Sequence, residues 1–141
     1  MSTLSVINIQ GQSAATLPVF QDSTGTEYGR LCRAFVNFNG KGSVSTNQST
    51  YGSFNVTSVY KNATGDYTIS FTKNMPDTGY CVTCSSQYSN SVTSTRGSFA
   101  GPYSNSTTPF SQNSIRIQNT YVDSNQGIYG DSDLISVAIF R

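Results

Sequence analysis

The stretch Asp66-Tyr67-Thr68-Ile69-Ser70-Phe71-Thr72 indicates the fold more clearly than any other part of the chain. Apolar and small polar side chains alternate along it, so one face of an extended strand would carry Tyr67, Ile69 and Phe71. Residues 54–60 are also rich in β-branched and aromatic residues, and residues 61–65 have turn composition. The pattern predicts a β-hairpin with one buried face and one polar face.

Similar signals recur on both sides of this hairpin. We expect further strands at residues 31–38, 80–87, 114–119 and 134–140, a weak edge strand or loop at 43–52, and a strand near 92–99. The segment 134–140 is the most apolar and is expected at the centre of a sheet or between subunits. No segment has a helical apolar period. About seven or eight short strands separated by turns predict an all-β fold, an antiparallel β-sandwich of jelly-roll-like form.

Residues 1–30 differ from the body, which we place at residues 31–141. This N-terminal segment is too short and too interrupted to fold alone, so we expect an extended arm that lies against the body or against another protein. Its residue before Pro18 is biased toward extended backbone. The side chains proposed to insert into a partner surface are Leu4, Val6, Ile7, Leu17, Val19 and Phe20.

The composition argues against an enzyme. The chain has no histidine, eight basic residues and seven acidic residues, and the acidic residues show no pairing along the sequence. General acid–base catalysis usually uses histidine or a carboxylate with a shifted pKa. The many serines lack a histidine partner and a Gly-x-Ser-x-Gly elbow. We therefore expect no catalytic residues and no cofactor, with a glycan depolymerase only as a distant alternative.

Charge and hydropathy restrict the partners. The net charge is +1 and the basic residues are dispersed, so nucleic-acid binding is not expected. The apolar runs are too short to span a membrane. The N-terminal residues lack the basic and apolar regions of a signal peptide, which predicts synthesis and retention in a cytoplasm until release.

The three cysteines are expected to be free thiols, since their number is odd and no signal peptide is apparent. Cys81 and Cys84 form a lone C-x-x-C without the second pair of a zinc site. On a strand the two thiols would point to opposite faces. We interpret the cysteines as small buried or half-buried apolar residues.

Two groups of residues suggest binding. Asp123, Asp131 and Asp133, with Asn125, supply oxygens that could hold a divalent cation, but their spacing matches no EF-hand and aspartate more often caps turns, so no metal site is predicted. Five tyrosines fall in expected loops, where aromatic rings could stack on sugars or contact proteins. These tyrosines are Tyr51, Tyr88, Tyr103, Tyr121 and Tyr129.

Four blocks together carry a family resemblance: CRAFVNFNGKG at residues 32–42, SFNVTSV at 53–59, GDYTISFTKNMPD at 65–77 and ISVAIF at 135–140. Their order and turn residues resemble a β-domain that recurs in structural proteins of tailed bacteriophages. This domain is common in tail fibres and small virion proteins of marine phages, including cyanophages. The resemblance covers about residues 31–141.

The resemblance implies a virion component, assembled in the cytoplasm of a bacterial host, whose N-terminal arm docks on other virion proteins of the capsid or tail. It also implies a homotrimer, because phage fibres are generally trimeric. The chain lacks a shaft-like repeat, which favours a short fibre, knob or capsid decoration over a long tail fibre. A carbohydrate-binding receptor module that acts through the loop tyrosines is the alternative, and one appendage could combine both roles.

Overall fold

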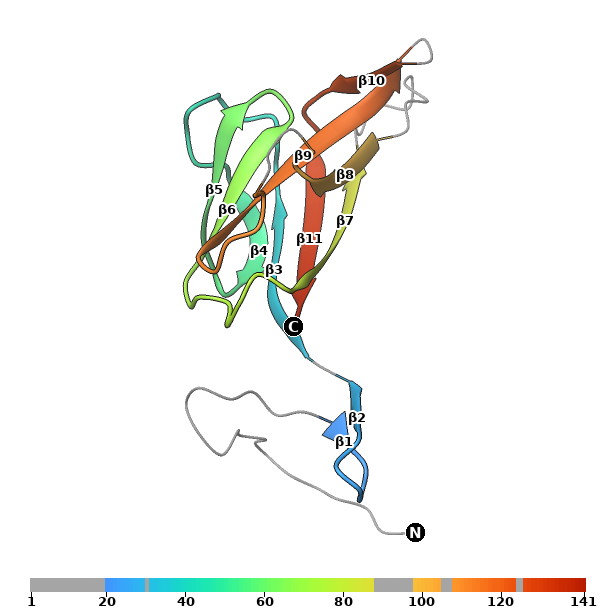
Figure 1. The fold of residues 1–141 in the computed structure, drawn as a ribbon. Helices are drawn as coiled ribbons and strands as arrows, with labels where there is room; N and C mark the ends of the chain where they lie inside the picture. Colours follow the sequence, from blue (N-terminus) through green and yellow to red (C-terminus); the bar gives the residue numbers. More distant parts are fainter. Residues whose placement is uncertain (1–19, 30, 88–97, 105–107, 124–125) are drawn as a thin grey trace. The chain divides into compact units, whose positions relative to one another are not determined.

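The computed structural model describes residues 20–29, 31–87, 98–104, 108–123 and 126–141. Within these ranges the protein is built from β-strands and loops, without a helix (Figure 1). The chain divides into two compact units, Met1–Leu31 and Cys32–Arg141. The strands are β1 (Phe20–Gln21), β2 (Glu27–Gly29), β3 (Cys32–Phe38), β4 (Thr50–Phe54), β5 (Val56–Ala63), β6 (Asp66–Phe71), β7 (Cys81–Gln87), β8 (Ser98–Pro102), β9 (Ser114–Asp123), β10 (Gln126–Tyr129) and β11 (Leu134–Phe140).

The larger unit is a sandwich of two antiparallel sheets, which confirms the predicted fold class (Figure 1). One sheet has the strand order β4-β3-β11-β7. The other has the order β10-β9-β6-β5, and β8 pairs with the opposite edge of β9. The apolar strand β11 lies between β3 and β7, at the centre of its sheet, as its composition predicts.

The core lies between the two sheets and is formed by alternating side chains. In β6 the predicted face is buried: Tyr67 and Ile69 are fully buried and Phe71 is 6% exposed. Strands β3, β9 and β11 contribute similar rows of buried side chains, because successive side chains of a strand point to opposite faces. The other core residues are Ala34, Val36, Phe38, Val59, Met75, Tyr80, Ile115, Ile117, Ile135, Val137 and Ile139. Burying an aliphatic or aromatic side chain of this kind contributes about 1.5–3 kcal/mol.

The predicted strand at residues 54–60 is interrupted at Asn55, where the chain passes from one sheet to the other. Asn55 has a φ of 56°, a left-handed conformation that asparagine tolerates better than most residues. Its Oδ1 accepts a hydrogen bond from the Lys73 amide at 2.7 Å. Its Nδ2 donates to the carbonyl oxygens of Arg33 and Lys73, both at 3.1 Å. These bonds hold the corner between β4 and β5.

The predicted turn at residues 61–65 is shorter than expected. Strand β5 continues to Ala63, and the tight turn is completed by Gly65, whose φ is 68°. A Cβ on Gly65 would lie 2.4 Å from the carbonyl oxygen of Asn119, so the turn requires glycine. The longer strand places Lys61 on the same face as Val59, toward the interior.

Three further boundaries differ from the predictions. Residues 39–49 form the loop after β3, and the weak edge strand is β4, which begins at Thr50. The strand predicted near 92–99 overlaps β8 at Ser98–Pro102, while residues 88–97 lie outside the described ranges. Strand β9 extends past residue 119, where the predicted strand ends, to Asp123, and it pairs with β10.

The described part of the smaller unit is a two-stranded hairpin of β1 and β2. Residues 22–26 form its turn, as their composition predicts. Asp22 Oδ1 accepts hydrogen bonds from the amides of Thr24 at 2.8 Å and Thr26 at 2.9 Å. Phe20 is 53% exposed. The other proposed docking residues, Leu4, Val6, Ile7, Leu17 and Val19, lie outside the described residues.

Candidate functional site

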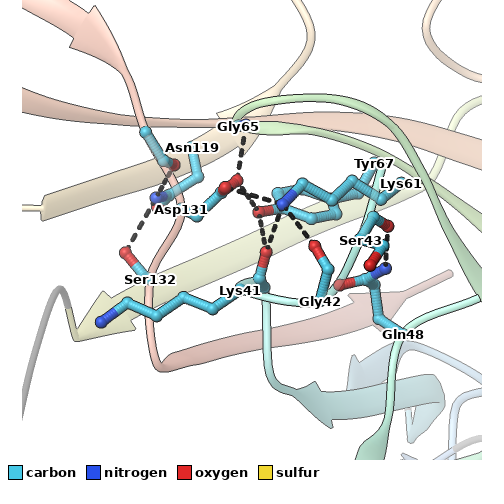
Figure 2. Close-up of polar contacts among 12 residues, drawn as sticks. Lys41, Gly42, Ser43, Gln48, Lys61, Gly65, Tyr67, Asn119, Asp131 and Ser132 are labelled. Carbon is cyan, nitrogen blue, oxygen red and sulfur yellow. Dashed lines mark hydrogen bonds and ion pairs between the residues drawn. The ribbon is translucent and has the colours of Figure 1, made fainter. Parts of the chain in front are cut away.

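An ion pair with a buried lysine lies at one end of the sandwich, where Lys61 of β5 meets the partly exposed Asp131 between β10 and β11 (Figure 2). The Lys61 side chain is 3% exposed, and its Nζ lies 2.6 Å from Asp131 Oδ2. The same ammonium donates to the carbonyl oxygens of Gly40 at 3.0 Å and Gly42 at 2.7 Å. Three acceptors match the three protons of a lysine ammonium, so the buried charge is fully satisfied.

The second oxygen of Asp131 is also used. Asp131 Oδ1 accepts hydrogen bonds from the Gly65 amide at 2.9 Å and from the Tyr67 hydroxyl at 2.7 Å. Burial, the hydrogen bond to Asp131 and the negative charge of that carboxylate all raise the pKa of Tyr67. We call Lys61, Tyr67, Asp131 and the carbonyls of Gly40 and Gly42 the lysine cluster. It joins three parts of the chain: the loop at residues 40–42, the β5–β6 hairpin and the segment between β10 and β11.

Next to the lysine cluster, Asn119 of β9 ties the end of β9 to the segment before β11 (Figure 2). Its Nδ2 donates to the Gly130 carbonyl at 2.6 Å and to Ser132 Oγ at 2.8 Å. Asn119 and Ser132 are both fully buried. Buried polar groups with several partners favour one arrangement of the loops over others.

The aspartates considered for a metal site have other roles. Asp131 belongs to the lysine cluster, and Asp133 pairs with Lys41 at 2.7 Å. The side chain of Asp123 and the whole of Asn125 lie outside the part of the chain that the structure describes. Over the part of the chain that the structure describes, no group of three or more histidine, cysteine, aspartate or glutamate side chains could hold a metal ion.

The cysteines are free thiols with different environments. Cys32 and Cys84 are half-buried, as interpreted from the sequence, but Cys81 is exposed, which corrects that interpretation. Cys81 and Cys84 lie on opposite faces of β7, as alternation predicts. Cys84 packs against the core, and burial raises the pKa of its thiol to about 11.

Most of the tyrosines predicted in loops lie on strands. Tyr51 is in β4, Tyr121 in β9 and Tyr129 in β10, while Tyr103 directly follows β8. Tyr88 falls outside the described residues. Gly, Ser and Asn near these tyrosines predict loops, but residues 120–123 of β9 and 126–129 of β10 pair as strands. Sheet pairing by the backbone therefore overrides weak local propensity.

The structure brings two of these tyrosines together with an arginine. The rings of Tyr103 and Tyr129 have centroids 6.2 Å apart and planes inclined by 20°. The Arg116 guanidinium carbon lies 4.2 Å from the centroid of the Tyr103 ring, a cation–π contact. We call Tyr103, Arg116 and Tyr129 the tyrosine–arginine stack. Tyr51 belongs to the other sheet, so the structure separates it from this stack.

The stack is held by the outer face of β9. Arg116 donates from Nε and from a terminal nitrogen to the two carboxylate oxygens of Asp66, and these bonds raise the pKa of the guanidinium. Gln118 Oε1 accepts hydrogen bonds from the Ser104 amide at 3.0 Å, the Ser104 hydroxyl at 2.9 Å and the Tyr129 hydroxyl at 3.4 Å. Neither Arg116 nor Gln118 is among the site residues predicted from the sequence. The signal was present, because alternation with Ile115 and Ile117 places both residues outward.

A second aromatic group lies on the outer face of the other sheet. Phe35 of β3 and Phe54 of β4 are paired across the strands, with ring centroids 6.3 Å apart. They are 39% and 55% exposed. We call them the phenylalanine pair. A shallow hollow of about 290 Å³ adjoins Phe35 and is lined further by Asn37, Thr83, Cys84, Ser85, Ser136, Val137 and Ala138.

No protein-family model, curated protein or solved structure matches this chain. The resemblance to phage structural proteins therefore stays a prediction that depends on the sequence blocks alone. In the described ranges, no helix is long and apolar enough to cross a membrane.

Proposed function

We propose that this chain is a non-enzymatic virion structural protein of a tailed bacteriophage, forming a short fibre, knob or decoration. It associates with copies of itself through the sandwich, and residues 1–30 dock on other virion proteins. The family resemblance motivates the virion assignment. The phenylalanine pair is the structural observation that supports self-association.

The face around the phenylalanine pair suits contact with a second copy. Phe54, Phe35, Ala138 and Thr83 form one row across the four strands of the sheet. The neighbouring row consists of Gly52, Asn37, Ser136 and Ser85. Neither row contains a charge, and two large exposed rings provide apolar area to bury.

Solution mass tests self-association. Light scattering of the full chain over a range of concentrations is expected to give an oligomer, a trimer by the family inference, and Phe54→Ser is expected to give a monomer. Tyr60→Ser is the matched control, because Tyr60 is 39% exposed and belongs to the other sheet. A monomer for all three proteins, or equal loss in both variants, contradicts assembly through the phenylalanine pair.

Particle association tests the docking role of the N-terminal segment. Peptide mass spectrometry of purified particles is expected to detect the full chain and to miss a variant that lacks residues 1–30. The truncated protein is expected to keep the oligomeric mass of the full chain. Particles that retain the truncated protein contradict docking through this segment.

A second candidate function is recognition of host-surface glycans, and the tyrosine–arginine stack favours it. Exposed tyrosine rings beside polar side chains are a common arrangement for carbohydrate contact, since the ring packs on C–H groups while neighbouring groups bind hydroxyls. Retention on whole host cells or their lipopolysaccharide is expected for this function. Binding to particles alone is expected for pure decoration.

A further inference from the structure

We infer that the tyrosine–arginine stack, together with Gln118, is a binding subsite for an uncharged pyranose with equatorial hydroxyls, such as β-linked glucose or N-acetylglucosamine. This inference rests on the second candidate function and names its ligand class. Tyr129 supplies the stacking face, and Gln118 supplies a hydrogen-bond donor. Both residues lie on the outer face of the sheet that contains β9 and β10.

The two tyrosine rings form a step in which the Tyr129 ring is partly exposed. Nearly parallel rings in contact are separated by about 3.5 Å between planes. The centroids lie 6.2 Å apart, farther than this separation, which is typical of laterally offset stacking of Tyr103 and Tyr129. The Arg116 guanidinium lies against one face of Tyr103, whereas Tyr129 is 42% exposed and offers its ring to a ligand. A pyranose whose hydroxyls are equatorial presents flat C–H faces that fit such a step.

The position of the step is set by the backbone. Tyr129 pairs with Thr120 in the register between β10 and β9, so it stands on the outward face. The Tyr103 amide donates to the Arg116 carbonyl at 3.0 Å, which fixes the segment after β8 against β9. The rings are thus supported before a ligand arrives, which lowers the ordering cost of binding.

The charge of the subsite favours a neutral sugar. Arg116 is the cation of the stack, and both carboxylate oxygens of Asp66 accept hydrogen bonds from it. The Asp66 side chain is 6% exposed, so this carboxylate serves Arg116 rather than solvent. An anionic sugar would gain little electrostatic attraction from Arg116, because Asp66 already neutralises its charge.

Gln118 provides a polar contact beside the rings. The Ser104 amide can only donate, so the Gln118 atom that it contacts is the carbonyl oxygen. Within the described residues, the hydrogen bonds of Gln118 all use this oxygen. Its Nε2 is therefore available to donate to a sugar hydroxyl. A donor at the edge of a stacking ring orients the sugar as well as holding it.

Titration calorimetry and saturation-transfer NMR of the full chain with a β-1,4-linked glucose hexamer and a β-1,4-linked N-acetylglucosamine hexamer test the inference. An oligogalacturonate hexamer is the anionic comparison. We expect binding of at least one neutral hexamer. Tyr129→Ala is expected to weaken it about tenfold or more, which corresponds to 1.4 kcal/mol or more. Tyr129→Phe is expected to bind within about twofold of the wild type, since it keeps the ring.

Gln118→Glu tests the contribution of the amide donor to binding without removing the hydrogen bonds that Gln118 accepts within the fold. Glutamate keeps an oxygen acceptor for Ser104 and Tyr129 but removes the amide donor, so weaker binding with unchanged circular dichroism is expected. Tyr51→Ala is the matched control, because Tyr51 is 64% exposed on the other sheet, and unchanged affinity is expected.

The contrary outcomes are distinct. No binding of either neutral hexamer at millimolar concentration overturns the inferred ligand class. If only the oligogalacturonate binds and Tyr129→Ala abolishes that binding, glycan recognition stands and the uncharged class is wrong. If a neutral hexamer binds and Tyr51→Ala weakens it while Tyr129→Ala does not, glycan recognition stands and the subsite is wrong. If none of the three hexamers binds and host cells do not retain the protein, the second candidate function fails as well.

Discussion

Replacing Lys61 with methionine tests the role of the lysine cluster directly. Methionine has a similar length but cannot donate, so the substitution removes the bonds to Asp131, Gly40 and Gly42. The Lys61 side chain is 3% exposed, so water cannot readily replace the ammonium. Removing one partner of a buried ion pair costs about 3–5 kcal/mol. We expect this loss from the Lys61→Met variant, which is a large part of the roughly 5–15 kcal/mol by which domains are stable.

Urea unfolding measures this loss. The chain has nine tyrosines and no tryptophan, so tyrosine fluorescence and far-ultraviolet circular dichroism are the appropriate probes. Lys41→Met is the matched control. The Lys41 side chain is 42% exposed and pairs with Asp133 at the surface, and breaking such a pair costs about 0–1 kcal/mol. High salt is expected to change the difference between the two variants little, since a buried pair is weakly screened.

A double variant strengthens the test. Lys61→Met with Asp131→Asn removes both charges, so it is expected to be more stable than the sum of the single changes predicts, by about 0.5–3 kcal/mol. If Lys61→Met lowers the free energy of unfolding no more than Lys41→Met does, the lysine cluster does not stabilise the sandwich.

Three further predictions concern stability and reactivity. Asn55→Ala is expected to lower the free energy of unfolding by about 2–4 kcal/mol, because alanine disfavours the positive φ and makes none of the side-chain hydrogen bonds. Asn55→Gly is expected to lose less, because glycine adopts a positive φ without strain. Equal losses of the two variants in urea unfolding would contradict a contribution from the backbone conformation. Burial raises the pKa of Tyr80 from its ordinary 10.0 to about 12. The unfolded chain therefore loses this proton at a lower pH than the folded protein does. The stability contributed by the neutral hydroxyl is fully present below about pH 10 and is lost as the pH rises through 12. The expected loss is roughly 3 kcal/mol, and Tyr80→Phe is expected to flatten the curve of unfolding free energy against pH; an unchanged curve would refute this. At pH 8, exposed Cys81 is expected to react with a thiol reagent about tenfold faster than Cys84. Mass spectrometry of the labelled peptides measures the two rates. Equal rates would contradict the burial of Cys84.

The fold class and most of the core can be read from the alternation of side chains along the sequence. Alternation is a local property with a period of two residues, so it can be read without knowledge of the partner strand. The buried faces of β3, β6 and β11 follow from it, and the apolar composition of residues 134–140 predicts the central place of β11. The opposite faces of Cys81 and Cys84 follow from the same rule.

The places where distant segments meet depend on long-range packing and cannot be read from local patterns. A lysine beside turn residues indicates a solvent-exposed turn, yet Lys61 is buried because Asp131 and two carbonyls from another loop surround its ammonium. Asn55 lies in a continuous β-like pattern, and the second sheet makes it a corner. The tyrosine–arginine stack joins Tyr103, Arg116 and Tyr129 through the pairing of β9 with its neighbours. Strand pairing is non-local, so no local pattern specifies which outward side chains become neighbours.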